Sequence, residues 1–375
     1  MGKTLNIESV QTAMREHGLN QARIAKEIGV SRAAVTKWLT LEGFPRPDKL
    51  LKLGMLLKLG FKQLVDESRD PMEPVVAFRR KGDRKTTQDH LERAKHMGLL
   101  LRQLATSLPF DQLASPATLR NPVCEYRYLQ QVAQKIRQEI NVPDTKPIQF
   151  RDLIDQFAQL HAVIIPVLWG DKRHHENALH VYLPDSMTTW VYLNLDSNIH
   201  DFKFWMAHEL GHVYAPRLCE DAGEDFADAF AQALLFPEAS ARMAHDALSR
   251  IRGKGARINR IKDIAQDYGI SPTTVNLALE EYAREHDVES VDVGKDIYAA
   301  STNFNKEFRT VSGLLFPQIP PSAKQYISVC REDFQSPFFD TLQRYVRSTN
   351  VSAGFVETVM QLPLRDAREI VEELR

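Results

Sequence analysis

The chain has 375 residues, of which 43% are hydrophobic and 26% are charged. These proportions are typical of a soluble globular protein, and the length predicts two or three domains, each with its own core. The formal net charge of −1 argues against a uniformly basic nucleic-acid-binding protein, so any surface for DNA must be local.

The sequence has no long apolar run and no charged-then-apolar leader, so we expect no membrane contact and a cytoplasmic location. Its three cysteines are widely spaced and odd in number. This argues against a disulfide framework and fits a reducing compartment.

Residues 5–65 have the pattern of short amphipathic helices separated by turns. The runs NIESVQTAMREHG and NQARIAKEIGV carry apolar residues at helical spacing and reach a glycine, Gly18 or Gly29, near their ends. The run SRAAVTKWL begins at Ser31, a residue type favoured as a helix N-cap. We therefore predict an all-helical first domain over residues 1–66.

A basic segment follows this domain. Residues 67–85 contain Pro71, Pro74 and the run FRRKGDRKTT, and they show no clear hydrophobic period. This composition is typical of a linker. A long helix is expected near 87–107, so we treat 67–122 as a basic linker and helix.

Residues 123–290 mix predicted helices and strands. CEYRYLQQVAQKIRQEI and PIQFRDLIDQFAQLH predict helices, whereas AVIIPVL, ALHVYL and TTWVYLNL predict strands. Two further helices are expected over FKFWMAHELGHVY and EDFADAFAQALLFP. Strands followed by helices favour an α+β domain. The tail, 291–375, has mainly helical patterns, and we assign it no function.

One internal similarity links the two parts of the chain. IAKEIGVSRAAV, residues 24–35, resembles IAQDYGISPTTV, residues 264–275. Both predict a helix, a glycine turn, a serine cap and a second helix. The second copy lies in a helix-turn-helix-like segment over 259–284. Any helix-turn-helix packs with the same small and apolar positions, so we expect this copy to close the core of its own domain.

The run HELGH places two histidines four residues apart. Positions i and i+4 share one face of a helix, so His208 and His212 can bind one zinc ion. Glu209, rotated by about 100°, can reach a water activated by the metal. Glu224 in the next helix is the candidate third ligand. Asp228 can hydrogen-bond to one histidine and fix its tautomer. Compensation of the helix dipole is the alternative role for the two acids.

The sequence from HELGH to EDFADAFAQALLFP resembles the ImmA/IrrE family of metallopeptidases, part of the zincin group. The arrangement of Glu224 and Asp228 is similar to that in thermolysin-like enzymes. The resemblance covers roughly residues 123–285, and it departs at Phe236, where the family more often has Met. It implies a gluzincin-like zinc endopeptidase whose substrate is a repressor, cleaved in a stress, DNA-damage or mobile-element response.

This activity assigns further roles. Glu209 is the expected general base. If TTWVYLNL forms an edge strand, Tyr192 and Asn194 would lie along an extended substrate peptide; an ordinary sheet strand is the alternative. Cys219 offers a thiolate that could occupy the open metal position as a regulatory switch, the alternative being a small apolar loop residue. The candidates for stabilising the oxyanion are Tyr214, His174, His175 and His180.

Residues 5–65 resemble the XRE (Cro/repressor-like) helix-turn-helix, including the start of the following helix from Pro47 to Leu51. The spacing in SRAAVTKWL places Val35 and Trp38 in the core and leaves its polar residues outside. The residues expected to face DNA are Gln21, Ser31, Arg32, Thr36 and Lys37. A helical protein-interaction module is the alternative.

Together these patterns predict a multidomain chain. It has an all-α helix-turn-helix domain, an α+β zincin-like peptidase domain and a mainly helical C-terminal region. We expect a DNA-binding regulator with zinc-dependent endopeptidase activity. Its expected partners are DNA and a protein substrate, and the sequence is compatible with a homodimer. The alternative is a non-proteolytic transcription repressor or antitoxin whose metal domain is a sensor or scaffold. Glu209 favours the enzyme, because a sensor needs no such base.

Overall fold

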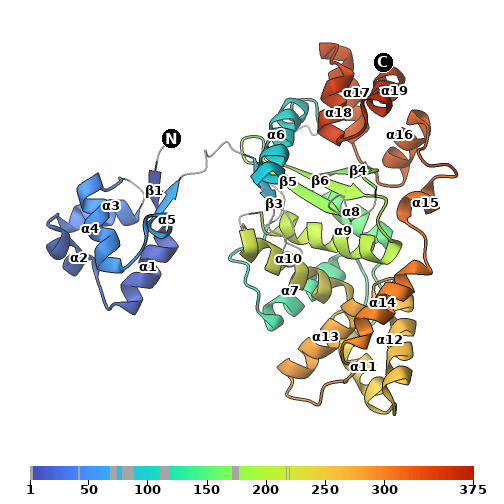
Figure 1. Ribbon diagram of the computed structural model, residues 1–375, viewed down its shortest axis with the longest axis horizontal. Coiled ribbons are helices and arrows are strands. Elements are labelled where there is room, and N and C mark those ends of the chain that lie inside the picture. The colour runs from blue at the N-terminus through green and yellow to red at the C-terminus, as the bar shows by residue number, and fades with distance from the viewer. Residues whose placement is uncertain are drawn as a thin grey trace. The chain divides into compact units, whose positions relative to one another are not determined.

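The computed structural model describes residues 3–40, 43–67, 74–77, 88–109, 118–170, 177–216, 218 and 220–375. The chain divides into two compact units: unit 1, residues 1–73, and unit 2, residues 74–375. Each unit has a hydrophobic core of its own. The described residues are mostly helical, with one four-stranded sheet in unit 2 (Figure 1). None of their helices is both long and apolar enough to cross a membrane.

Unit 1 is a small helical bundle closed by two short strands. Its helices are α1 (Ile7–Glu16), α2 (Gln21–Ile28), α3 (Arg32–Leu39), α4 (Pro47–Leu57) and α5 (Phe61–Leu64). β1 (Lys3–Leu5) and β2 (Val65–Glu67) pair antiparallel. The first three helices begin at side-chain caps, which satisfy backbone N–H groups at their N-termini: Asn6, Asn20 and Ser31.

The sheet of unit 2 has the strand order β3-β5-β6-β4. The strands are β3 (Val75–Ala77), β4 (Ala162–Val167), β5 (Ala178–Leu183) and β6 (Thr188–Asn194). β5 pairs antiparallel with both β3 and β6, whereas β4 and β6 are parallel. Every residue of β4 and β6 is buried, and only one residue of β5 is partly exposed.

Two expectations about this sheet are wrong. β6 lies between β5 and β4, so the strand that carries Tyr192 and Asn194 is not an edge strand. β3 lies within residues 67–85, which we expected to be linker, and it instead pairs with β5 in unit 2. Hydrophobic periodicity missed it because it has only three residues.

Helices cover both faces of the sheet (Figure 1). α8 and α9 pack on one face, while α6 packs on the other together with the C-terminal helices α17 and α18. The helices of unit 2 are α6 (Gln88–Ala105), α7 (Tyr126–Glu139), α8 (Phe150–Gln159), α9 (Ile199–Tyr214), α10 (Glu220–Leu235), α11 (Glu238–Ser249), α12 (Lys254–Tyr268), α13 (Pro272–Glu285), α14 (Asp296–Lys306), α15 (Val311–Leu315), α16 (Ala323–Glu332), α17 (Phe338–Thr349), α18 (Ala353–Met360) and α19 (Leu364–Leu374).

The C-terminal residues share the core of the sheet. The indole of Trp169, beyond the end of β4, donates a hydrogen bond to the Met360 carbonyl at 2.9 Å. The hydroxyl of Tyr192 donates to the Val359 carbonyl at 2.8 Å. Residues 123–290 and 291–375 therefore lie in one compact unit, and the C-terminal helices support the sheet on which the candidate site is built.

Candidate metal centre

α9 carries the HELGH run and is buried on nearly all sides. The side chain of Asn198 caps its first turn by accepting a hydrogen bond from the His200 amide. From Trp205 to Tyr214 every residue is buried, as expected for a helix enclosed by a sheet and other helices. The histidine rings therefore have fixed surroundings.

A close approach between α9 and α10 brings the third candidate ligand into place. At Gly211, an added Cβ would lie 2.9 Å from the Cα of Ala227. Any larger residue would push the two helices apart. The glycine inside HELGH therefore lets α10 approach closely enough for Glu224 to reach the histidines.

The three predicted ligands converge. The Nε2 atoms of His208 and His212 are 3.2 Å apart. The Glu224 carboxylate lies 3.5 Å from the first of these nitrogens and 3.3 Å from the second. Among the described residues, His208, His212 and Glu224 form a group whose ligand atoms all lie within 4.8 Å of one another. The arrangement can hold a metal ion.

Asp228 lies where the sequence predicts an orienting acid. Its Oδ1 is 2.9 Å from Nδ1 of His208, so that nitrogen carries the proton when the carboxylate is ionised. The other ring nitrogen, Nε2, then presents its lone pair toward His212 and Glu224. This hydrogen bond fixes the tautomer that a metal ligand needs.

Electrostatics inside the cluster favour a cation. Burial lowers the pKa of His208, but hydrogen bonding to Asp228 and Glu224 outweighs it and raises that pKa to about 9. Burial likewise raises the pKa of Glu224, yet the two histidines lower it to about 2. Burial lowers the pKa of His212, which favours its neutral form. A buried carboxylate beside two imidazoles is a donor set that fits a divalent ion.

Glu209 is buried beside the ligands without a complete set of hydrogen bonds. It is 3% exposed, and its Oε2 has no hydrogen-bond partner. Burial raises the pKa of this carboxyl to about 8. A buried polar atom without a partner is costly to stability.

The candidates for stabilising an oxyanion separate in the structure. His180 on β5 lies beside the cluster, with its ring centroid 5.4 Å from that of His212. Its Nε2 is buried without a partner, and burial lowers its pKa well below the ordinary value, so the ring is neutral. The Tyr214 hydroxyl instead donates to Gln156 at 2.8 Å. His174, His175 and Cys219 lie outside the described residues.

The two side chains assigned to a substrate strand have structural roles instead. Tyr192 and Asn194 are both fully buried. The amide of Asn194 donates to the Gly170 carbonyl at 3.0 Å, and its oxygen accepts from the Trp169 amide at 3.2 Å. Because β6 has neighbours on both sides, it cannot pair with a peptide.

In unit 1, most of the residues expected to face DNA lie on the surface. Ser31, Arg32, Thr36 and Lys37 are exposed, and Gln21 is partly exposed. The hydroxyl of Thr36 donates to the side-chain oxygen of Gln21 at 3.0 Å, which joins α2 and α3 at this face. The hydroxyl of Ser31 accepts from the Ala34 amide at 3.1 Å.

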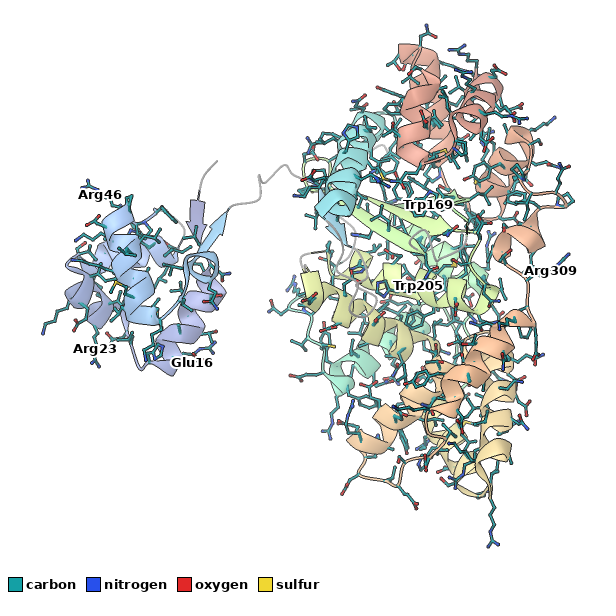
Figure 2. All side chains as sticks on the ribbon, in the orientation of Figure 1. Glu16, Arg23, Arg46, Trp169, Trp205 and Arg309 are labelled. Carbon is teal, nitrogen blue, oxygen red and sulfur yellow. The ribbon has the colours of Figure 1, made fainter. Side chains whose placement is uncertain are left out.

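Arg23, within α2, and Arg46, at the start of α4, project from unit 1 (Figure 2). Sequence analysis missed one neighbour of the metal centre. In unit 2, the ring of Trp205 packs 5.2 Å from that of His208. Its position three residues before His208 on one helix is the signal that could have found it.

Comparison with protein-family models, curated proteins and solved structures gave no match to this chain. Function is therefore inferred from the chain's own residues.

Proposed function

We propose that the protein is a zinc-dependent endopeptidase joined to a DNA-binding regulator. The observation that carries the proposal is the convergence of His208, His212 and Glu224, with the buried Glu209 and its unpartnered Oε2 beside them. Two imidazoles and one carboxylate from two helices are a ligand set that binds zinc and leaves a fourth position free. The resemblance to ImmA/IrrE metallopeptidases supports the same function.

The ligand set also favours zinc over other ions. Calcium and magnesium prefer oxygen ligands, whereas this cluster offers two nitrogens and one carboxylate. Asp228, at 2.9 Å from His208, is the kind of outer partner that holds a ligating imidazole in one tautomer and orientation. Zinc, when bound, supplies Lewis acidity that activates water as a nucleophile near neutral pH.

The remaining steps belong to the chain. Glu209 accepts a proton from the nucleophilic water and donates it to the leaving amine; burial, which raises its pKa to about 8, suits this shuttle. The neutral ring of His180 presents an unpartnered Nε2 beside the ligands. In the tautomer protonated at Nε2, it would donate a hydrogen bond to the oxygen of the substrate carbonyl.

Unit 1 supplies the second half of the proposal. Its helix-turn-helix presents Arg32, Thr36 and Lys37 on one surface, as a DNA-binding helix does. Binding to a promoter would place the peptidase near a repressor on the same DNA and raise the local concentration of substrate. A regulatory DNA-binding protein is therefore the proposed substrate class.

The test of the metal site is elemental analysis of the purified protein. We expect about one zinc per chain, with most of it lost in the His208→Ala/His212→Ala variant. Full zinc occupancy in that double variant would contradict the ligand assignment. The Lys324→Ala variant, at a surface residue of α16, is a matched control and should keep its zinc.

The test of cleavage is incubation with repressors encoded beside the protein's gene, followed by gel electrophoresis. The wild-type protein should produce fragments, and Glu209→Gln should bind zinc but produce none. If both proteins regulate transcription equally and neither cleaves, the metal unit is a sensor or scaffold. Adding DNA at fixed salt should stimulate cleavage by the full chain, but not by a variant lacking residues 1–66.

A further inference from the structure

The edge of the sheet nearest the metal centre is covered by β3, the first strand of unit 2. β3 follows unit 1 directly in the sequence and pairs antiparallel with β5. The register places Val75 opposite Tyr182, Val76 opposite Val181 and Ala77 opposite His180. Without β3, the backbone of β5 would be an open edge that could pair with another extended chain.

This edge adjoins the candidate metal centre. The residue opposite Ala77 is His180, whose ring lies beside that of His212 at 5.4 Å between centroids. β3 also packs against α10, the helix that carries Glu224. The opposite edge strand, β4, lies instead against α8 and α17. Only the β5 edge is therefore next to the ligands.

Resting on the proposed peptidase activity, we propose that the β5 edge binds the substrate as an added strand, and that β3 is its resident occupant. The substrate class is an extended, unfolded peptide, which pairs with such an edge through its main chain. Because β3 holds the same hydrogen-bonding groups, a substrate must displace it. β3 thus competes in cis with the substrate for the β5 edge.

The contacts of β3 suit a strand that can leave the edge of the sheet. It has three residues, and the side chains of Val75 and Val76 are only partly buried. Its approach depends on Gly98 of α6, where an added Cβ would lie 2.6 Å from the Cβ of Pro74, which precedes β3, and 3.3 Å from Cγ1 of Val181 on β5. The strand is therefore seated by a close contact that one methyl group would disrupt.

The first experiment locks β3 in place. Val76→Cys with Val181→Cys is designed to join two residues that lie directly opposite each other in the antiparallel pair, where side chains are close neighbours; Cys124 and Cys219 are replaced by Ser in all proteins compared. The probe is fluorescein-labelled β-casein with the zinc-loaded full chain. Oxidised protein should cleave β-casein at least about tenfold more slowly than reduced protein. This is the effect expected when the fraction of molecules with a free β5 edge falls tenfold. Equal rates would overturn the proposal.

The second experiment unseats β3. Gly98→Ala should lower KM for β-casein several-fold and leave kcat unchanged, because a larger fraction of molecules has a free edge. Gly255→Ala is the matched control, since an added Cβ there meets nothing within 4 Å, and it should match wild type. An unchanged KM in Gly98→Ala would contradict the proposal.

Amide hydrogen exchange of the zinc-free protein gives a readout independent of activity. Residues 178–183 should exchange faster in Gly98→Ala than in wild type and Gly255→Ala, and slower again when β-casein is added. If neither Gly98→Ala nor added β-casein changes the exchange of residues 178–183, β3 does not compete with substrate for this edge. If this exchange result is obtained but none of the zinc-loaded proteins cleaves β-casein, the peptidase activity fails while the assignment of the binding edge stands.

Discussion

Two segments of this chain have the same local structure but different surroundings. In unit 1, α2 ends at Gly29 with φ of 73° and Ser31 caps α3; in unit 2, α12 ends at Gly269 with φ of 62° and Ser271 caps α13. Each serine hydroxyl accepts a hydrogen bond at 3.1 Å from the amide three residues on. The shared sequence pattern therefore builds the same helix, turn and helix twice.

The two copies differ in what covers the second helix. In α3, Arg32, Thr36 and Lys37 are exposed, whereas the equivalent Pro272 and Asn276 of α13 are buried. α13 packs against α11 and α14. The expectation that this copy closes the core of its own domain is confirmed by that burial. Local sequence determines the turn, and tertiary packing decides which copy leaves the face of its second helix exposed.

Among the changes that test this comparison, removing unit 1 should have the largest effect on DNA binding. A chain of residues 74–375 has its own core and should fold and keep its zinc. It should bind operator duplexes, selected with the full chain from a random library, about a thousandfold more weakly, because specific binding exceeds non-specific binding by at least that factor. Anisotropy titrations measure this. Undiminished specific binding would mean that α13, or another surface of unit 2, reads DNA.

The same substitution at equivalent positions should have very unequal consequences for stability. Asn276 is 2% exposed, so Asn276→Arg places a charge in the core and should lower the free energy of unfolding by about 3 kcal/mol or more. Thr36 is exposed, so Thr36→Arg should change the free energy of unfolding by less than about 0.5 kcal/mol. Urea unfolding of both variants checks this. Equal losses would show that the two faces are equally covered.

A lysine from a neighbouring helix contacts the turn in each copy, which gives a test by pH. Lys49 Nζ donates to the Ile28 carbonyl at 3.2 Å, and Lys203 Nζ donates to the equivalent Tyr268 carbonyl at 2.6 Å. Lys203 is 3% exposed, and burial lowers its pKa from 10.5 to about 8. The unfolded state therefore binds more protons between these values, so this group adds stability as pH rises from about 8 to 10.5.

The expected gain from Lys203 is up to about 3 kcal/mol. It should appear as a difference between wild type and Lys203→Met in chemical unfolding measured at several pH values, with the variant lacking this part of the slope. Lys49→Met, at the partly exposed position of unit 1, is the matched control. If wild type and Lys203→Met change in parallel across this range, the lysine is not buried as a cation.

The local parts of both sites could be predicted from the sequence. The spacing of His208 and His212 places their rings on one helix face whatever the rest of the chain does, and Ser31 is recognisable as a cap from its neighbours alone. The position of β6 could not be predicted, because it depends on a non-local pairing: β4 lies parallel to β6 on one side, while β5 pairs antiparallel with it on the other. The place of His180 beside His212 has the same non-local origin.

Substitutions on α3 should weaken DNA binding without changing stability. Arg32→Ala or Lys37→Ala should cost about 1–3 kcal/mol in operator binding if the side chain contacts a base edge, and relax specificity at one position. A phosphate contact would weaken binding to all duplexes alike. The equivalent Leu277→Ala in α13 should leave DNA binding unchanged, although Leu277 is 40% exposed. Wild-type affinity in both α3 variants would place the DNA-binding surface elsewhere.

The smallest effect should come from the serine caps, which have the same role in both copies. Ser31→Ala and Ser271→Ala each remove a side-chain acceptor from the first turn of a helix, and each should lower the stability of its unit by about 1 kcal/mol. Glycine is tolerated better at this position, so Ser→Gly should cost only a few tenths of a kcal/mol. This separates the two roles of Ser31. If Ser31→Gly keeps the stability of unit 1 but weakens operator binding, the hydroxyl contacts DNA as well as capping α3. Ser271→Gly, tested in parallel, should leave DNA binding unchanged, because the start of α13 is packed inside unit 2.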